Sequence, residues 1–129
     1  MKPFTMISCA AVLAGTAAAQ AQSLKGPGFE INPVNAHVYE VVSEGGHGGA
    51  AFWCAASLFV EQELKQPMGT EIYVARGAGP SETTDRRSAA QFTIDPAAAG
   101  ITPAQGSDDL NDLVVGEHMA ANEARTFCD

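Results

Sequence analysis

Cysteine and histidine are the residue types in this chain with the clearest potential for catalysis. A cysteine thiolate beside a histidine base can attack a carbonyl carbon. Cys54 lies in an apolar segment that predicts a helix, and the chain offers His37, His47 and His118 as bases. A thiol-dependent hydrolase that uses Cys54 is therefore one hypothesis, although the wider sequence motif of cysteine peptidases is missing.

The same cysteine has a structural interpretation that we favour. Cys54 and Cys128 are the two cysteines outside the N-terminal segment, and two cysteines allow only one pairing within a chain. A bridge between them would close a loop of roughly 75 residues and stabilise the fold by about 4–5 kcal/mol. Because that is a large share of the net stability of a small domain, we expect a disulfide and keep the hydrolase as the alternative.

Two loops rich in glycine, hydroxyl and arginine residues suggest a second kind of chemistry, the binding of a small anion. Exposed N–H groups at the start of a helix can bind an anion, and hydroxyl and guanidinium donors can complete such a site. The candidate donors are His47, Gly48, Gly49, Ser81, Thr83, Thr84, Arg86 and Arg87. The simpler interpretation, which we favour, is that the two arginines are solvated charges beside Glu82 and Asp85 in a surface turn.

Cofactors and metals are not expected. The segment 46–51 matches the G-x-G-x-x-A pattern of dinucleotide-binding folds, but the chain is too short for a doubly wound sheet. The three histidines are scattered without helical ligand spacing. The acidic residues between 108 and 117 lack the glycine and the spacing of a calcium-binding loop.

The first 21 residues predict that the chain is exported. Lys2 supplies a positive charge, residues 6–14 are apolar, and Ala19-Gln20-Ala21 fits the cleavage pattern of a signal peptide. The apolar run is too short to span a membrane, and no second run follows it. Cleavage would leave residues 22–129 in a compartment where disulfides persist. We expect the periplasm, with extracellular secretion as the alternative.

The charge balance limits the partners. The chain has 7 Lys and Arg against 15 Asp and Glu, and a formal net charge of −8, which the loss of Lys2 would take to −9. Nucleic acids and polyanionic surfaces need clustered positive charge and are therefore excluded as expected partners. A small anion, a peptide or a component of the cell envelope stays open as a partner, and so does the oligomeric state.

The hydrophobic pattern predicts an α+β fold. We expect one main helix packed on a small, mostly antiparallel sheet of about four strands, with a short C-terminal helix and one disulfide. The chain would divide into a signal peptide at 1–21, a flexible lead-in at 22–28 and a single domain at 29–129. The expected elements are strands at 36–42, 71–76, 88–95 and 110–115, and helices at 50–65 and 119–128.

Three segments carry a resemblance to a known group of proteins. They are FWCAASLFVEQEL from residue 52, EIYVARGAGPSETTDRRSAAQFTID from residue 71 and MAANEARTFC from residue 119. Together they resemble a family of small exported proteins of alphaproteobacteria. The resemblance implies export and brings no activity, and no catalytic residue of that family can be carried over to this sequence.

These observations favour a binding or accessory function over catalysis. We expect a small exported non-catalytic domain of the cell envelope, with any site between the loops at 45–49 and 77–87. The thiol-dependent hydrolase is the alternative, and the state of the Cys54 sulfur separates the two hypotheses.

Overall fold

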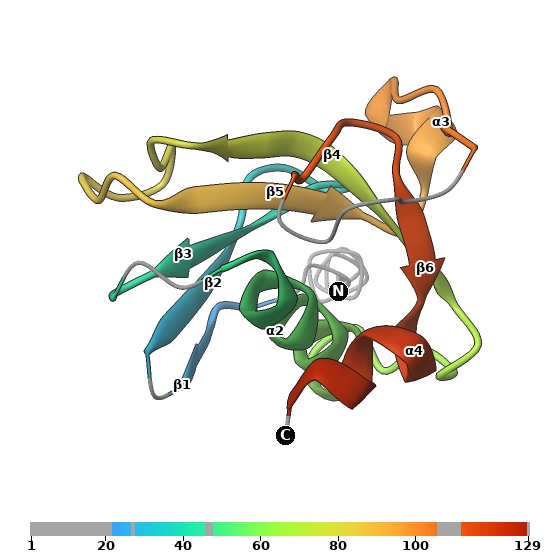
Figure 1. Cartoon of the computed structure of the whole chain (residues 1–129), viewed down its shortest axis with the longest axis horizontal. Helices are drawn as coiled ribbons and strands as arrows, with labels where there is room; N and C mark the ends of the chain where they lie inside the picture. The colour runs from blue at the N-terminus through green and yellow to red at the C-terminus, as the bar shows by residue number, and fades with distance from the viewer. Residues whose placement is uncertain (1–21, 27, 46–47, 106–111, 129) are drawn as a thin grey trace, which may run out of the picture.

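The computed structural model describes residues 22–26, 28–45, 48–105 and 112–128, which form a curved sheet with one long helix packed against it (Figure 1). The predicted signal peptide and His47 lie outside the described residues. In the described part of the chain, no helix is long and apolar enough to cross a membrane.

The sheet is antiparallel throughout, with six strands in the order β1-β2-β3-β5-β4-β6. The strands are β1 (Leu24–Gly26), β2 (Phe29–Pro33), β3 (Tyr39–Ser43), β4 (Glu71–Gly79), β5 (Ala89–Thr93) and β6 (His118–Ala120). The central strands β3 and β5 are buried along their whole length, so both of their faces are covered. The register of β4 against β5 shifts on both sides of Arg76, which bends this end of the sheet.

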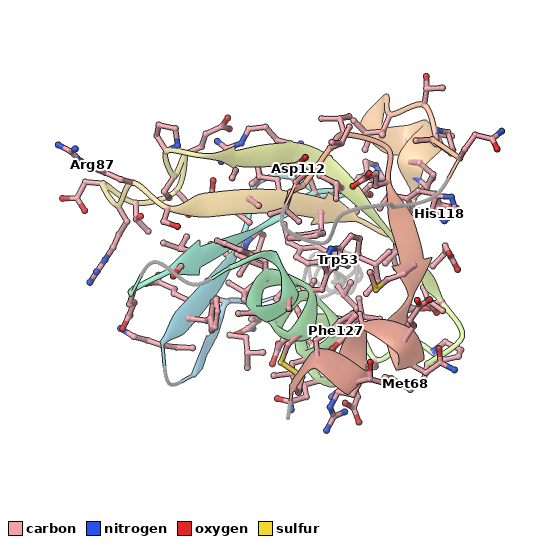
Figure 2. All side chains as sticks on the ribbon, viewed as in Figure 1. Trp53, Met68, Arg87, Asp112, His118 and Phe127 are labelled. Atoms are coloured by element: carbon pink, nitrogen blue, oxygen red, sulfur yellow. A yellow bond between two sulfur atoms is a disulfide. The ribbon has the colours of Figure 1, made fainter. Side chains whose placement is uncertain are left out.

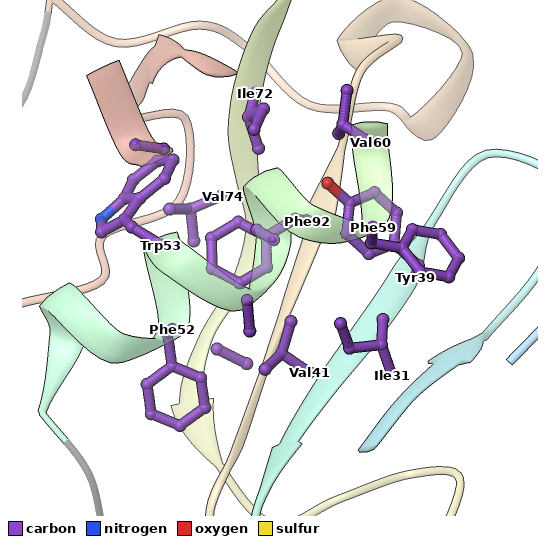
Figure 3. Packing of buried hydrophobic residues seen from close by; sticks show 14 of the residues in the cluster. Ile31, Tyr39, Val41, Phe52, Trp53, Phe59, Val60, Ile72, Val74 and Phe92 are labelled. Atoms are coloured by element: carbon purple, nitrogen blue, oxygen red, sulfur yellow. The ribbon is translucent and has the colours of Figure 1, made fainter. Parts of the chain in front are cut away.

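One face of the sheet, called the inner face below, is covered by helix α2 (Gly49–Gln62). Alternation along the strands sends Tyr39 and Val41 of β3 to this face, where they meet the aromatic side chains of the helix (Figure 3). The rings of Trp53 and Phe92 lie 5.2 Å apart, edge to face, and those of Tyr39 and Phe59 lie 4.6 Å apart. The apolar spacing along α2 is therefore used for the core, as expected from the sequence.

Three short helical segments complete the chain. They are α3 (Pro96–Ala99), α4 (Ala121–Arg125) and the 3-10 turn η1 (Thr126–Cys128). The Cys54–Cys128 disulfide joins η1 to α2, with the two Cα atoms 4.9 Å apart. The predicted disulfide and the predicted α+β class are thus confirmed.

The strand count differs from the prediction, because the sheet has six strands and not about four. β1 lies inside the segment 22–28 that we expected as a lead-in, and β2 adds a second strand before β3. The strand predicted at 110–115 is wrong for residues 112–115, the part of it that the structure describes, because they form no strand. The last strand of the described chain is β6 instead. Gly116, whose φ of +93° favours glycine, turns the chain immediately before β6.

The predicted closing helix also begins later than expected. Met119 is a β6 residue that pairs with Ile72, so the helical conformation starts at Ala121. The apolar side chain of Met119 is buried in the core.

Candidate functional site

A buried carboxylate organises the face of the sheet opposite α2, called the outer face below. Glu40 follows Tyr39 in β3, so its side chain points away from the helix, and it has no exposed surface. The loop between β4 and β5 folds over it. The Glu40 carboxylate accepts five hydrogen bonds, from Ser81 Oγ at 2.7 Å, Thr83 Oγ1 at 2.6 Å, the N–H groups of Glu82 at 2.8 Å and Thr83 at 3.0 Å, and Gln91 Nε2 at 3.0 Å.

These donors decide the charge of Glu40. Burial alone would raise the pKa of the carboxyl group, but the hydrogen bonds from Thr83, the Glu82 N–H, Gln91 and Ser81 outweigh it and lower the pKa to about 2. Glu40 is therefore an anion at neutral pH. It is held by neutral dipoles, without an arginine or lysine in direct contact among the described residues.

A second layer of contacts holds the loop itself. Thr84 Oγ1 donates to Ser81 Oγ at 2.8 Å, and Asn32 Nδ2 of β2 donates to Thr83 Oγ1 at 3.0 Å. Arg76 donates to the carbonyl oxygens of Gly77, Pro80 and Ala89, and it lies 3.6 Å from the carboxylate of Glu82. The loop is thus fixed from β2, β3, β4 and β5 at once.

The structure divides the predicted anion-binding residues between two faces of the sheet. Ser81 and Thr83 bind an anion, but that anion is the chain's own Glu40. Gly48 and Gly49 lie at the start of α2, on the inner face. Arg86 and Arg87 are exposed, and Figure 2 shows Arg87 at the end of the molecule far from β6, pointing away from it. Ser43 N–H donates to the carbonyl oxygen of Ser88, so the two loops leave the sheet at the same end, but His47 lies outside the described residues and a joint anion site stays a prediction.

The residues proposed for thiol catalysis do not form a catalytic pair in this structure. The Cys54 sulfur is bonded to Cys128 and offers no thiolate in this structure. Both ring nitrogens of His118 have partners: Nδ1 lies 2.8 Å from Glu71 Oε2, and Nε2 lies 3.1 Å from the carbonyl oxygen of Ala104. His37 is exposed in the turn before β3. Across the described ranges, no group of three or more side chains could hold a metal ion.

The described residues also enclose a groove of about 490 Å³. It is lined by one side of α2, by the β1–β2 hairpin and by η1. Of its twelve lining residues, ten carry no charge or amide in the side chain, and the exceptions are Lys25 and Gln62. The lining residues are Leu24, Lys25, Gly26, Phe29, Ile31, Ala51, Cys54, Ala55, Leu58, Gln62, Phe127 and Cys128. We call this site the disulfide groove, because both half-cystines lie in its wall.

The disulfide groove forms where α2 leaves the β1 edge of the sheet uncovered. α2 packs over the central strands, while β1 and β2 extend past it and curl toward η1 (Figure 1). Phe29 and Phe52 close the groove toward the core, with their ring centroids 6.0 Å apart. Leu58 and Phe127 stay partly exposed as a result, although both are apolar. An open concave surface with apolar walls is typical of ligand-binding sites.

No family model, curated protein or solved structure matches this chain. The resemblance to exported alphaproteobacterial proteins therefore stays a prediction, and the disulfide groove has to be interpreted from its own chemistry. Sequence reasoning missed the groove. One signal in the sequence could have indicated the groove. Ala51, Ala55 and Leu58 recur at helical spacing and form an apolar stripe on α2 beside the aromatic residues that face the sheet.

Proposed function

We propose that this chain is a small exported protein that acts by binding, as a binding or accessory component of the cell envelope, and that its ligand site is the disulfide groove. The single observation that carries the proposal is the groove itself, whose volume of about 490 Å³ lies in the range of small-ligand sites. Its walls are apolar, so the part of a ligand that enters it must be apolar too.

Two other observations support the exported, non-catalytic part of this proposal. The N-terminal pattern is that of a signal peptide, and a disulfide is compatible with an oxidising compartment such as the periplasm. The sulfur that would serve a hydrolase is engaged in that disulfide. Glu40, the carboxylate with the strongly lowered pKa among the described residues, is enclosed by its own donors and has no exposed surface for a substrate to reach.

The experiment that tests this function measures the fluorescence of N-phenyl-1-naphthylamine, a neutral dye that brightens in apolar sites, with the protein purified after export. Leu58→Glu places a charge in the disulfide groove and should weaken dye binding at least tenfold. Val114→Glu is the matched control, because Val114 is an apolar residue that is 51 % exposed outside the groove, and it should leave dye binding unchanged. Circular dichroism and urea unfolding establish that both variants fold.

Two results would contradict the proposal. The first is no increase in dye fluorescence with the wild-type protein. The second is a Leu58→Glu variant that folds and still binds the dye as the wild type does. If Leu58→Glu fails to fold, Ala51→Phe replaces it, since a larger apolar side chain at Ala51 fills the groove without adding a charge.

A further inference from the structure

We infer that the Cys54–Cys128 disulfide is a redox switch for the disulfide groove: reduction by a dithiol releases η1 from α2 and weakens the hold of the groove on its ligand. This inference rests on the proposed binding function and adds a regulation of the same site. The observation behind it is a contrast between two neighbouring segments. α4 is anchored by several contacts, whereas η1 is joined to α2 by the disulfide.

The disulfide is accessible in the folded chain. Cys54 and Cys128 are both partly exposed, and both line the groove. A small dithiol can therefore reach the sulfur atoms through the groove, whose volume is about 490 Å³. Exposed disulfides are more easily reduced than buried ones, and regulatory disulfides belong to the exposed class.

The reaction is thiol–disulfide exchange, with a dithiol as the reductant. One thiolate of the dithiol attacks the sulfur of Cys54 or Cys128, the S–S bond between them breaks, and the other cysteine leaves as a thiolate. The second thiol of the reductant then displaces the first, so the reductant leaves with a disulfide of its own. Two electrons and two protons pass to the protein, in which both cysteines become thiols.

Helix α4 has anchors that reduction leaves in place. The N–H groups of Ala121 and Asn122 donate, each at 2.8 Å, to carbonyl oxygens of the segment between α2 and β4. At the other end of the helix, Arg125 pairs with Glu61 of α2. The side chains of Ala121 and Ala124 are buried in the core. α4 should therefore stay docked when the disulfide is broken.

η1 lacks comparable anchors. None of its residues is buried, and the hydrogen bonds of Thr126 run back to α4, where its hydroxyl group donates to the carbonyl oxygen of Glu123 at 2.7 Å. Among the described residues, no hydrogen bond or ion pair joins η1 to α2 or to the sheet. After reduction, the remaining link is the apolar contact of the partly buried Phe127 with the core.

Release of η1 removes part of the lining of the groove. Phe127 and Cys128 line it together with α2 and the β1–β2 hairpin, so a ligand would lose these contacts and leave more apolar surface in water. The coupling is reciprocal, since binding and reduction act on one equilibrium. A ligand must therefore oppose reduction by the same factor by which reduction weakens the ligand.

The test compares the binding of N-phenyl-1-naphthylamine to the oxidised protein and to protein reduced with dithiothreitol, with the thiols counted by alkylation and mass. We expect reduction to weaken dye binding at least fivefold. Saturating dye should then make the disulfide harder to reduce by the same factor, which for fivefold is about 21 mV. In NMR spectra, reduction should move the amide signals of residues 126–128 toward random-coil positions and leave those of α4 and the sheet in place.

Two variants serve as controls. The paired variant Cys54→Ser, Cys128→Ser should bind the dye as the reduced wild type does, and dithiothreitol should not change its binding. Arg125→Gln is the matched control for loosening near the disulfide, because it removes the ion pair with Glu61 while the disulfide stays. It should leave dye binding within twofold of the wild type.

Three results would overturn the switch. They are a reduced protein that binds the dye as the oxidised one does, a loss of NMR signals across the whole sheet on reduction, and a folded protein whose disulfide resists dithiothreitol. The second result would make the disulfide a support of the entire fold. Failure of the dye to bind the oxidised protein would instead overturn the proposed function, and the NMR signals of residues 126–128 would still show whether reduction releases η1.

Discussion

The hydroxyl group of Thr83 and the carboxylate of Glu40 lie 2.6 Å apart, although 43 residues separate them in the chain. This hydrogen bond joins the tip of the β4–β5 loop to the middle of the sheet. Four further donors converge on the same carboxylate, so the conformation of the loop and the charge of one buried side chain depend on each other.

The first prediction concerns the removal of that charge. Glu40→Gln keeps the size of the side chain but turns an NH₂ group toward donors that need an acceptor. Lowering the pKa from 4.5 to about 2 corresponds to about 3 kcal/mol of stabilisation at neutral pH, and we expect Glu40→Gln to lower the free energy of unfolding in urea by about that amount. Glu44→Gln, at an exposed glutamate just after β3, should change it by less than about 0.5 kcal/mol. Equal stability of the two variants would contradict the prediction.

Acid should remove the same contribution without a mutation. The pKa of Glu40 is lower in the folded chain than in the unfolded one, so its stabilisation is fully present above pH 4.5 and is lost as the pH falls toward 2. The difference in unfolding free energy between wild type and Glu40→Gln should therefore narrow by about 1.4 kcal/mol per pH unit within this window. Urea titrations at several pH values measure it, and a difference that stays constant down to pH 2 would contradict the assignment.

A buried hydroxyl group provides the opposite case. Tyr39 is 4 % exposed, its hydroxyl group has no hydrogen-bond partner, and burial raises the pKa of the phenol. An unsatisfied buried hydroxyl costs roughly 1–3 kcal/mol, so Tyr39→Phe should raise the free energy of unfolding, by about 1 kcal/mol after relaxation. Tyr73→Phe, in β4 on the outer face, is the comparison and should bring no such gain. A less stable Tyr39→Phe variant would show that the hydroxyl has a partner in solution.

The disulfide should dominate the stability of the whole domain. The intact mass of the protein purified after export should be two hydrogen atoms below that of the dithiol form, with no thiol that can be alkylated. The paired variant Cys54→Ser, Cys128→Ser removes a bridge across 74 residues and should lower the free energy of unfolding by about 4–5 kcal/mol. Two free thiols in the exported protein, with Cys54 reacting rapidly below neutral pH, would instead revive the hydrolase hypothesis.

The elements that could be predicted are those whose own residues show a periodic pattern of apolar side chains. The alternation in β4 and β5 and the unbroken apolar spacing of α2 predicted these elements close to their true bounds. β1 has three residues and exists because β2 pairs with it, so no local pattern announces it. Val114 and Val115 are β-branched and suggested a strand, but they are exposed beside the turn at Gly116.

The candidate site shows the same division. The hydroxyl groups of the loop at 77–87 suggested a site for a small external anion, which we ranked below a surface turn; in the structure Ser81 and Thr83 of this loop donate to Glu40 instead. A glutamate in the middle of a predicted strand carries no sign that a distant loop will cover it. The disulfide groove is harder still to predict, because its outline depends on how far the β1–β2 hairpin extends past α2.

The walls of the disulfide groove come from Leu24–Ile31 and from Phe127 and Cys128, regions about a hundred residues apart in sequence, and α2 between them supplies the floor. The hairpin is held by the pairing of β2 with β3, and η1 is held to α2 by the Cys54–Cys128 disulfide. A single proteolytic cut before η1 would therefore leave Cys128 attached to the helix for as long as the disulfide is intact. A bound ligand would contact both flanks at once and should protect both of them from proteases.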